Sequence, residues 1–193
     1  MKKGSRLNNL REEGKYTVEQ PKSNLDFEFM CLKFRLRDFF NPPAGMLRET
    51  GMQRGYKVLD FGCGFGSHSI AASRPVGEKG KIYALDINPL AINKVRNTIK
   101  KRKLKNIETI QSDCKTGLPD NCIDVILIYD VFHHIQNKSD VLEEFYRVLK
   151  AECILSFSDH HMGKEDILSE LTGKGLFKLR EENKRTFSFV KIL

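Results

Sequence analysis

Hydrophobic positions along this chain follow two periods, which alternate from about residue 56 onward. Short apolar runs predict buried strands over residues 56–61, 81–87, 107–111, 123–130 and 153–158. Between these runs, apolar residues recur every three or four positions, as on one face of a helix, over residues 67–73, 89–102, 138–150 and 164–172. The last apolar stretch, residues 176–192, is typical of a hairpin.

This alternation of strands with helices predicts an α/β fold with a mostly parallel sheet. We expect a Rossmann-like sheet of seven strands with helices on both faces and an antiparallel hairpin at the C-terminus. The near-continuous apolar run over residues 123–130 is typical of a central parallel strand. In the helix that follows it, we expect Ser139 to be the N-cap residue.

The composition is that of a folded globular protein. Apolar residues make up 40% and charged residues 30% of 193 residues, which excludes a disordered chain and suits one core. No apolar run approaches the roughly 20 residues that cross a bilayer. The N-terminus has no apolar stretch after its basic residues, so we expect a cytoplasmic protein without a signal peptide. Five cysteines without a Cys-x-x-Cys pair argue against a disulfide framework or a four-cysteine zinc site.

A net charge of +8 raises the question of an anionic partner such as nucleic acid. The densest basic run, residues 93–106, also places Val95 and Ile99 at helical spacing. One face of that helix is therefore apolar, and its lysines belong to the opposite, solvated face. We accordingly do not expect a nucleic-acid partner, and the oligomeric state stays open.

Three glycines, Gly62, Gly64 and Gly66, stand at every second position between the first strand and its helix. Glycine at such a turn permits a left-handed backbone and the close approach of a ligand. A dinucleotide fingerprint, G-x-G-x-x-G, would place its third glycine at the position of Ser67. Ligands bind at the carboxyl ends of the strands in such a sheet, so this turn is the first candidate binding element.

A carboxylate stands at or just after the end of each of the first three strands. Asp86 stands 20 positions after Gly66, where it can accept hydrogen bonds from both hydroxyls of a ribose. Asp113 follows the third strand, where its carboxylate can accept from an adenine amino group. Asp60 would repel a pyrophosphate but suits a ligand with a positive amino group.

Five segments of the chain together resemble the class I S-adenosylmethionine-dependent methyltransferases. They are VLDFGCGFG, IYALDINPLAI, IQSDC, LPDNCIDVILIYDVFHHI and VLEEFYRVLK. The resemblance runs from about residue 56 to residue 158 and is greatest to the small-molecule branch that includes the ubiquinone and menaquinone C-methyltransferases. It implies S-adenosylmethionine as the cofactor. Members of that branch usually follow RVLK with Pro-Gly-Gly, which this chain lacks, so we expect a shorter connection to the next strand.

The resemblance also implies a role for each cofactor-binding position. The glycine turn receives the methionine part of the cofactor, and Asp60 helps to hold that turn and the amino group. Asp86 takes the ribose, while Asp113 and the backbone at Cys114 take the adenine. Tyr129 lends its backbone to the amino group. The expected cofactor-binding set is Asp60, Gly62, Cys63, Gly64, Gly66, Asp86, Ile87, Asp113, Cys114 and Tyr129.

Further titratable side chains follow the fourth and fifth strands. Methyl transfer from a sulfonium is a direct displacement, so the protein mainly aligns the acceptor. Where the acceptor must lose a proton, His133 is the preferred base, with Asp130 nearby. Asp159, His160 and His161 are further candidates. No metal is expected, because adjacent histidines seldom direct both rings to one ion.

The N-terminal residues are expected to cover the acceptor pocket, because little sequence is inserted between the later strands. Residues 1–50 are therefore interpreted as an arm and a helical cap, and residues 51–193 as the cofactor-binding domain. Within the cap, apolar side chains over residues 25–40 recur at helical spacing and can both pack on the sheet and line an apolar pocket. The candidate lining residues are Phe27, Phe29, Met30, Phe34, Phe39 and Phe40.

The function that these observations favour is methyl transfer from S-adenosylmethionine to a small, apolar or aromatic acceptor. Three alternatives stay open. The same chemistry could act on RNA or protein, or the chain could bind the cofactor without catalysing a reaction. A nicotinamide-dependent oxidoreductase is opposed by the glycine spacing and by Asp60.

Overall fold

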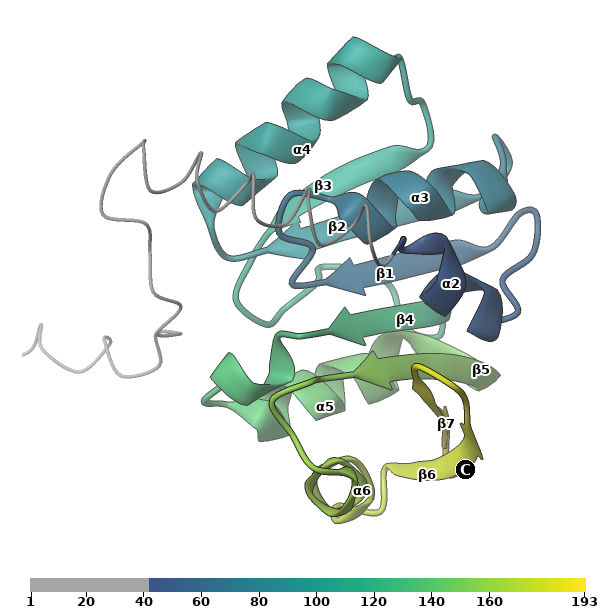
Figure 1. The fold of residues 1–193 in the computed structure, drawn as a ribbon, viewed down its shortest axis with the longest axis vertical. Helices are drawn as coiled ribbons and strands as arrows, with labels where there is room; N and C mark the ends of the chain where they lie inside the picture. Colours follow the sequence, from purple (N-terminus) through teal and green to yellow (C-terminus); the bar gives the residue numbers. More distant parts are fainter. Residues whose placement is uncertain (1–41) are drawn as a thin grey trace, which may run out of the picture.

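The computed structural model describes residues 42–193, which form one twisted sheet with helices on both of its faces (Figure 1). The strands are β1 (Lys57–Phe61), β2 (Lys81–Asp86), β3 (Ile107–Gln111), β4 (Ile123–Tyr129), β5 (Leu149–Ser158), β6 (Phe177–Glu182) and β7 (Phe187–Lys191). The helices are α2 (Ala44–Glu49), α3 (Ser67–Val76), α4 (Pro89–Arg102), α5 (Lys138–Val148) and α6 (Lys164–Thr172), with a short 3₁₀ turn, η1 (Phe132–His134). The predicted arm, the helix over residues 25–40 and its six lining residues lie outside the described residues.

The sheet has seven strands in the order β3-β2-β1-β4-β5-β7-β6. Strands β1 to β5 are parallel, and β7 pairs with β5 and with β6 in antiparallel fashion. Strand order reverses between β1 and β4, so that the carboxyl ends of β1, β2, β4 and β5 meet at one edge of the sheet. The predicted fold class is therefore confirmed.

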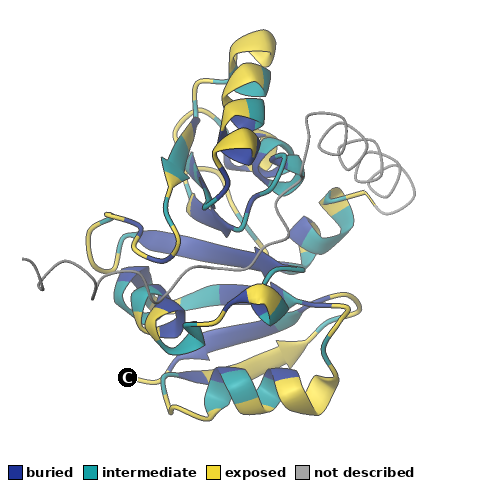
Figure 2. Ribbon diagram, turned by 90° about the vertical axis from the view of Figure 1, so that its left-hand side faces the viewer, coloured by how far each residue is buried: buried dark blue, intermediate teal, exposed yellow. Residues whose placement is uncertain are grey.

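Two apolar clusters fill the two sides of the sheet. Helices α3 and α4 pack on one side, where Ile92 and Val95 of α4 are fully buried. Helix α5 covers the other side with a stripe that includes Phe145, whose ring meets that of Phe61 edge-on at 4.9 Å. Strand β4 is buried along its whole length, as a central parallel strand must be (Figure 2).

Local sequence signals explain where several elements begin and end. Helix α4 starts at Pro89 behind Asn88, whose side chain accepts a hydrogen bond from the backbone N–H of Leu90. It ends at Arg102, and the C-cap residue Lys103 takes a left-handed conformation with φ of 54°. Helix α5 passes directly into β5 at Leu149, the short connection expected from the missing Pro-Gly-Gly.

The prediction that Ser139 is the N-cap residue of α5 is wrong. The helix begins at Lys138, with Asn137 in the N-cap position, so Ser139 already lies inside the first turn. There the Ser139 hydroxyl donates a hydrogen bond to Glu143 Oε1 at 3.4 Å, one turn along the helix. A serine within the first turn can bond to a nearby side chain, and the sequence pattern does not distinguish this from capping.

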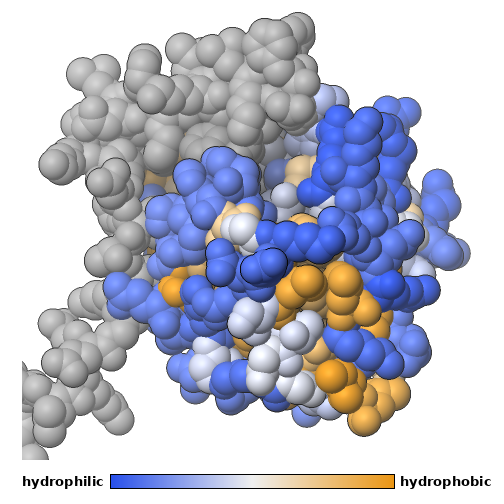
Figure 3. Space-filling view, turned by 60° about the horizontal axis from the view of Figure 1, so that its bottom comes forward, coloured by the Kyte–Doolittle hydropathy of each residue, from blue (hydrophilic) through white to orange (hydrophobic). Residues whose placement is uncertain are grey.

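The surface of the described part of the chain includes a small group of hydrophobic side chains at the hairpin end. Leu179, Ile192 and Leu193 are 37%, 38% and 84% exposed. Figure 3 brings this end of the molecule forward and shows hydrophobic residues gathered on it. Within residues 42–193, no helix combines the length and the hydropathy that a bilayer crossing requires.

Candidate functional site

The three glycines of the turn between β1 and α3 do not all have the same surroundings. All three have positive φ angles, of 70°, 51° and 80° in chain order. A Cβ on Gly62 would lie 2.6 Å from Val131 Cγ2, and one on Gly66 would lie 2.8 Å from Val95 Cγ2. Among the described residues, a Cβ on Gly64 would meet no atom within 4 Å. Two glycines are thus required by packing, while the third leaves open space against the turn.

Asp86, the last residue of β2, holds this turn in place. Its Oδ2 accepts a hydrogen bond from the backbone N–H of Gly64 at 2.8 Å, and its Oδ1 accepts from the N–H of Asn88 at 2.8 Å. Burial raises the pKa of Asp86, and the bonds from these amides act against that rise. A backbone hydrogen bond from Ile87 acts in the same direction as these two.

Asp60 lies beneath the turn and is 3% exposed. The hydroxyl of Ser69, in the first turn of α3, donates to Asp60 Oδ2 at 2.5 Å. Burial raises the pKa of Asp60, while nearby His68 and the bond from Ser69 act in the opposite direction. Ser69 was not among the predicted residues. The sequence does indicate it, because Ser69 stands two positions after the start of α3 at Ser67. Side chains in a helix tilt towards its N-terminus, and that of Ser69 therefore points back towards β1.

The loop after β3 carries the next two predicted residues. Asp113 is exposed, whereas Cys114 is 7% exposed, and burial raises the pKa of its thiol to about 11. Helix α5 anchors this loop, because Glu144 Oε1 accepts from the backbone N–H of Thr116 at 2.8 Å. Arg147 Nη1 also donates to the backbone carbonyl of Leu118 at 2.8 Å. The position of the loop therefore depends on α5.

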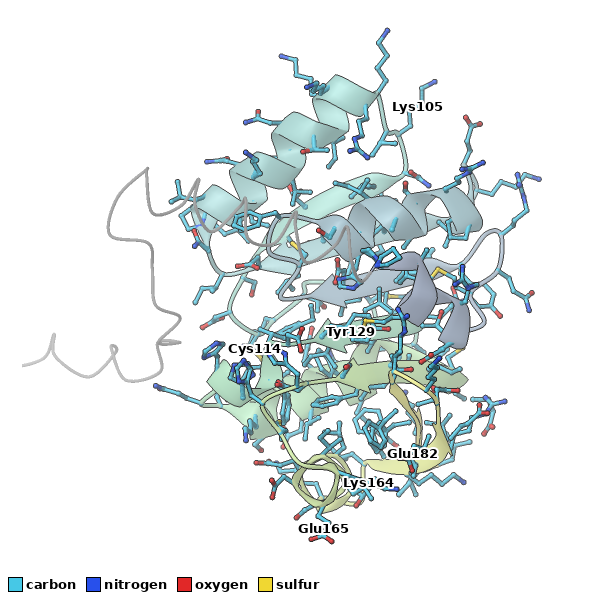
Figure 4. All side chains as sticks on the ribbon, viewed as in Figure 1. Lys105, Cys114, Tyr129, Lys164, Glu165 and Glu182 are labelled. Carbon is cyan, nitrogen blue, oxygen red and sulfur yellow. The ribbon has the colours of Figure 1, made fainter. Side chains whose placement is uncertain are left out.

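Tyr129, the last residue of β4, lies with Cys114 towards the edge at which the parallel strands end (Figure 4). Its hydroxyl forms a 2.7 Å hydrogen bond with Ser156 Oγ inside the molecule. Burial raises the pKa of Tyr129. Its ring meets that of His68 edge-on, with centroids 4.9 Å apart. The Tyr129 side chain thus packs against Ser156 and His68 inside the protein, and its backbone is the part that can contact a ligand.

Two aspartate–histidine pairs cross between the loops that follow β4 and β5. Asp130 Oδ1 contacts His160 Nδ1 at 2.7 Å, and Asp159 Oδ2 contacts His133 Nδ1 at 2.8 Å. His133 was predicted to act with Asp130, but in the structure it pairs with Asp159. The Asp159 side chain is fully buried. Although burial opposes it, the bonds that Asp159 accepts from His133 and His161 lower its pKa.

The four histidine rings at this edge form a continuous row in which neighbouring ring planes are tilted by 44°, 48° and 41°. The ring centroids of His134 and His133 are 3.9 Å apart, those of His133 and His161 4.2 Å, and those of His161 and His160 3.9 Å. Asp130 is held in the left-handed region with φ of 53°. That conformation is uncommon outside glycine and concentrates at functional sites. The loops after β4 and β5 therefore hold their polar side chains in a defined arrangement.

A cavity of about 460 Å³ lies between α5 and α6. His161 and Met162 form part of its wall, and Lys138 and Glu170 close part of it with an ion pair. None of its lining residues belongs to the glycine turn or to β2. This cavity is therefore a space beside the row of histidine rings and is separate from the surface of the glycine turn.

Comparisons with known proteins agree with this geometry. The chain matches the methyltransferase domain family over residues 52–189. The demethylmenaquinone methyltransferase of Geobacillus sp. (strain WCH70) is 30% identical over 105 residues, which are 54% of this chain and 45% of that protein. The ubiquinone/menaquinone biosynthesis C-methyltransferase UbiE of Azotobacter vinelandii is 36% identical over 103 residues, 52% of this chain and 41% of that protein. The chain thus spans less than half the length of these relatives.

Solved structures extend the comparison to the whole fold. A SAM dependent methyltransferase from Aquifex aeolicus superposes with a TM-score of 0.69 at 30% identity, covering 79% of this chain and 90% of that one. The [4+2]-cyclase SpnF, at 18% identity and a TM-score of 0.63, covers 72% of this chain and 57% of that one. The likeness to SpnF concerns the fold alone. With the family match over residues 52–189, the expected resemblance is confirmed, and this chain belongs to the methyltransferase domain family.

Proposed function

We propose that this protein is an S-adenosylmethionine-dependent methyltransferase that acts on a small, apolar or aromatic acceptor. The observation that carries the proposal is the open space at Gly64, where a Cβ would meet no atom of residues 42–193 within 4 Å, while Asp86 holds the same backbone from β2. The family match and the Aquifex aeolicus structure support the choice of cofactor. We include a cytoplasmic location in this proposal.

The residues at the glycine turn fit an adenosyl cofactor by their chemistry. Gly62, Cys63, Gly64 and Gly66 form the surface against which its methionine part would lie, and Asp60 holds that surface through Ser69. Asp86 and Ile87 would meet the ribose, Asp113 and Cys114 the adenine, and the Tyr129 backbone the amino group. When bound, the cofactor supplies a methyl group on a sulfonium, with a neutral thioether as the leaving group.

The protein's contribution is to hold the acceptor in line with that methyl group, since orientation supplies much of the rate in such a displacement. Asp130 and His133 are our candidates for contact with the acceptor. The contact of His133 Nδ1 with Asp159 fixes the ring, so that Nε2 is the atom placed to accept a hydrogen bond from the acceptor. Gly62 lies against Val131, which connects the turn to this loop.

Calorimetric titration with S-adenosylhomocysteine and, separately, with NAD tests the cofactor assignment. We expect the wild type to bind S-adenosylhomocysteine and not NAD. Binding of NAD alone, or of neither compound, would overturn the proposal.

The acceptor class needs a separate assay of S-adenosylhomocysteine formation with demethylmenaquinol, simple phenols and transfer RNA. Demethylmenaquinol is included because the curated relatives are named for that chemistry. Turnover with phenolic compounds supports the small-molecule assignment. Turnover with RNA alone contradicts that part and leaves the cofactor assignment intact.

A further inference from the structure

The crossed aspartate–histidine pairs bring metal-binding side chains together in a way that adjacent histidines alone could not. Residues Asp130 and Asp159 occupy equivalent positions on neighbouring parallel strands, one residue after the registered pair Tyr129 and Ser158. Each aspartate then meets a histidine from the opposite loop. The expectation of no metal considered only neighbours in sequence, whose rings seldom converge. Here, the donors come from two loops that the sheet holds side by side.

Three of these residues stand close to the spacing that a metal ion requires. Asp130, Asp159 and His160 each offer one donor atom, and the three atoms lie within 4.8 Å of one another. Bonds from nitrogen and oxygen ligands to zinc are about 2.0–2.2 Å, so two ligands of one ion are at most about 4.4 Å apart. Small side-chain rotations therefore suffice to bring all three atoms onto one ion.

Because Asp159 is buried, the negative charge of this cluster is poorly solvated by water. The Asp159 side chain is fully buried, and its one ion-pair partner among residues 42–193 is the His133 imidazole. A buried carboxylate beside a second carboxylate is costly unless a positive group offsets the two charges. A divalent ion between Asp130 and Asp159 would supply that charge.

We propose that Asp130, Asp159 and His160 bind one divalent first-row metal ion, such as Mn²⁺ or Zn²⁺. Two carboxylate oxygens and one imidazole nitrogen, without a thiolate, are the donors that suit such ions. His133 is a positioning residue in this site, because its ring and its backbone N–H both donate to Asp159 Oδ2, at 2.8 and 3.2 Å. Carboxylates that ligate metals commonly receive such orienting bonds.

The site is open on its outer side. His160 and Asp130 have side chains that are 66% and 29% exposed, so an ion there would keep positions for water or for oxygen atoms of an acceptor. This second role, unlike the metal site itself, rests on the proposed function. An acceptor with two neighbouring oxygen atoms would then be held by the ion beside the glycine turn.

The test is calorimetric titration of the full chain with MnCl₂ and ZnCl₂ after dialysis against a chelator, with no cofactor or acceptor present. We expect one ion per chain. Asp130→Asn, Asp159→Asn and His160→Gln should each weaken binding by about 100-fold or more, and His133→Gln by about tenfold. Asp140→Asn, an exposed aspartate in α5, is the matched control and should bind as the wild type does.

Circular dichroism must show that each variant is folded before its affinity is interpreted. Since Asp159 is buried, its variant is the one most at risk, and His160→Gln at the exposed position then carries the test. Absence of binding to the wild type at millimolar metal, or equal affinity in the folded ligand variants, would overturn the inference. Metal binding without S-adenosylhomocysteine binding would refute the proposed function alone, and the reverse result would refute the metal site alone.

Discussion

The carboxylate of Asp86 accepts a hydrogen bond from the backbone N–H of Gly64, 22 residues earlier in the chain, at 2.8 Å. The end of β2 thereby fixes the conformation of the turn that follows β1. A single side chain thus both shapes the open surface at Gly64 and stands beside it. Any ligand on that surface is therefore sensitive to Asp86 in two ways, through the shape of the turn and through direct contact.

We expect Asp86→Ala to weaken the binding of S-adenosylhomocysteine by at least about tenfold, because hydrogen bonds to a charged group contribute roughly 1.5–3 kcal/mol. Asp86→Asn keeps one acceptor oxygen and should fall between the alanine variant and the wild type. Calorimetry measures both. Glu108→Gln, on neighbouring β3 and paired with Lys81 at 3.1 Å, is the control and should leave the affinity unchanged. An Asp86→Ala variant with wild-type affinity would show that the ligand does not occupy this turn.

Gly64→Ala should separate ligand binding from folding. Its φ of 51° costs an alanine roughly 1–2 kcal/mol, but the new methyl group meets no atom within 4 Å in the part of the chain that the structure describes and enters the open space instead. Gly175→Ala, at φ of 68° between α6 and β6 and equally without a neighbour within 4 Å among residues 42–193, bears the same strain away from the turn. Denaturant unfolding should show similar losses for both variants, whereas calorimetry should show reduced binding only for Gly64→Ala. Equal binding by the two variants would mean that the space at Gly64 stays empty.

Gly62 sets a contrasting expectation, because its side of the turn is closed by protein. A methyl group there would lie 2.6 Å from Val131 Cγ2, so Gly62→Ala should lose more stability than Gly64→Ala. Val131→Ala in the same chain should recover part of that loss, which a double-mutant cycle by chemical denaturation measures. Additive losses would show that Val131 does not cause the clash.

Much of this fold could be predicted from local signals, and the site only in part. Helix α4 begins and ends where Pro89 and the basic last turn indicate, and β4 is as buried as its apolar run requires. The pairing of His133 with Asp159 could not be predicted in this way. The two residues are 26 positions apart, and they meet only because β4 and β5 pair with Tyr129 opposite Ser158. Which residues of two loops meet depends on the register of the strands before them, and no local sequence pattern encodes that register.

Tyr129→Phe should destabilise the protein without weakening cofactor binding. The Tyr129 hydroxyl is the hydrogen-bond partner of Ser156, which is fully buried, so its loss leaves a buried hydroxyl unsatisfied at a cost of about 1–3 kcal/mol. Removing both hydroxyls in Tyr129→Phe/Ser156→Ala should restore part of the stability. Thermal unfolding measures the cycle, and calorimetry with S-adenosylhomocysteine provides the second measurement. Loss of affinity in Tyr129→Phe would show that its side chain, and not its backbone alone, contributes to the ligand site.

Glu144 should make the stability of the protein depend on pH in the acid range. Although burial opposes it, hydrogen bonds from Arg147 and Thr116 lower the pKa of Glu144 from 4.5 to about 2. Because the folded state holds the lower pKa, this contribution is complete above pH 4.5 and is lost as the pH falls towards 2. Denaturant unfolding of the wild type and Glu144→Gln should therefore differ most near neutral pH and converge at the acid end. Glu181→Gln, on the exposed strand β6, is the control, and its difference from the wild type should not vary in that way. A gap between the wild type and Glu144→Gln that stays constant with pH would contradict the role given to this carboxylate in anchoring the loop after β3.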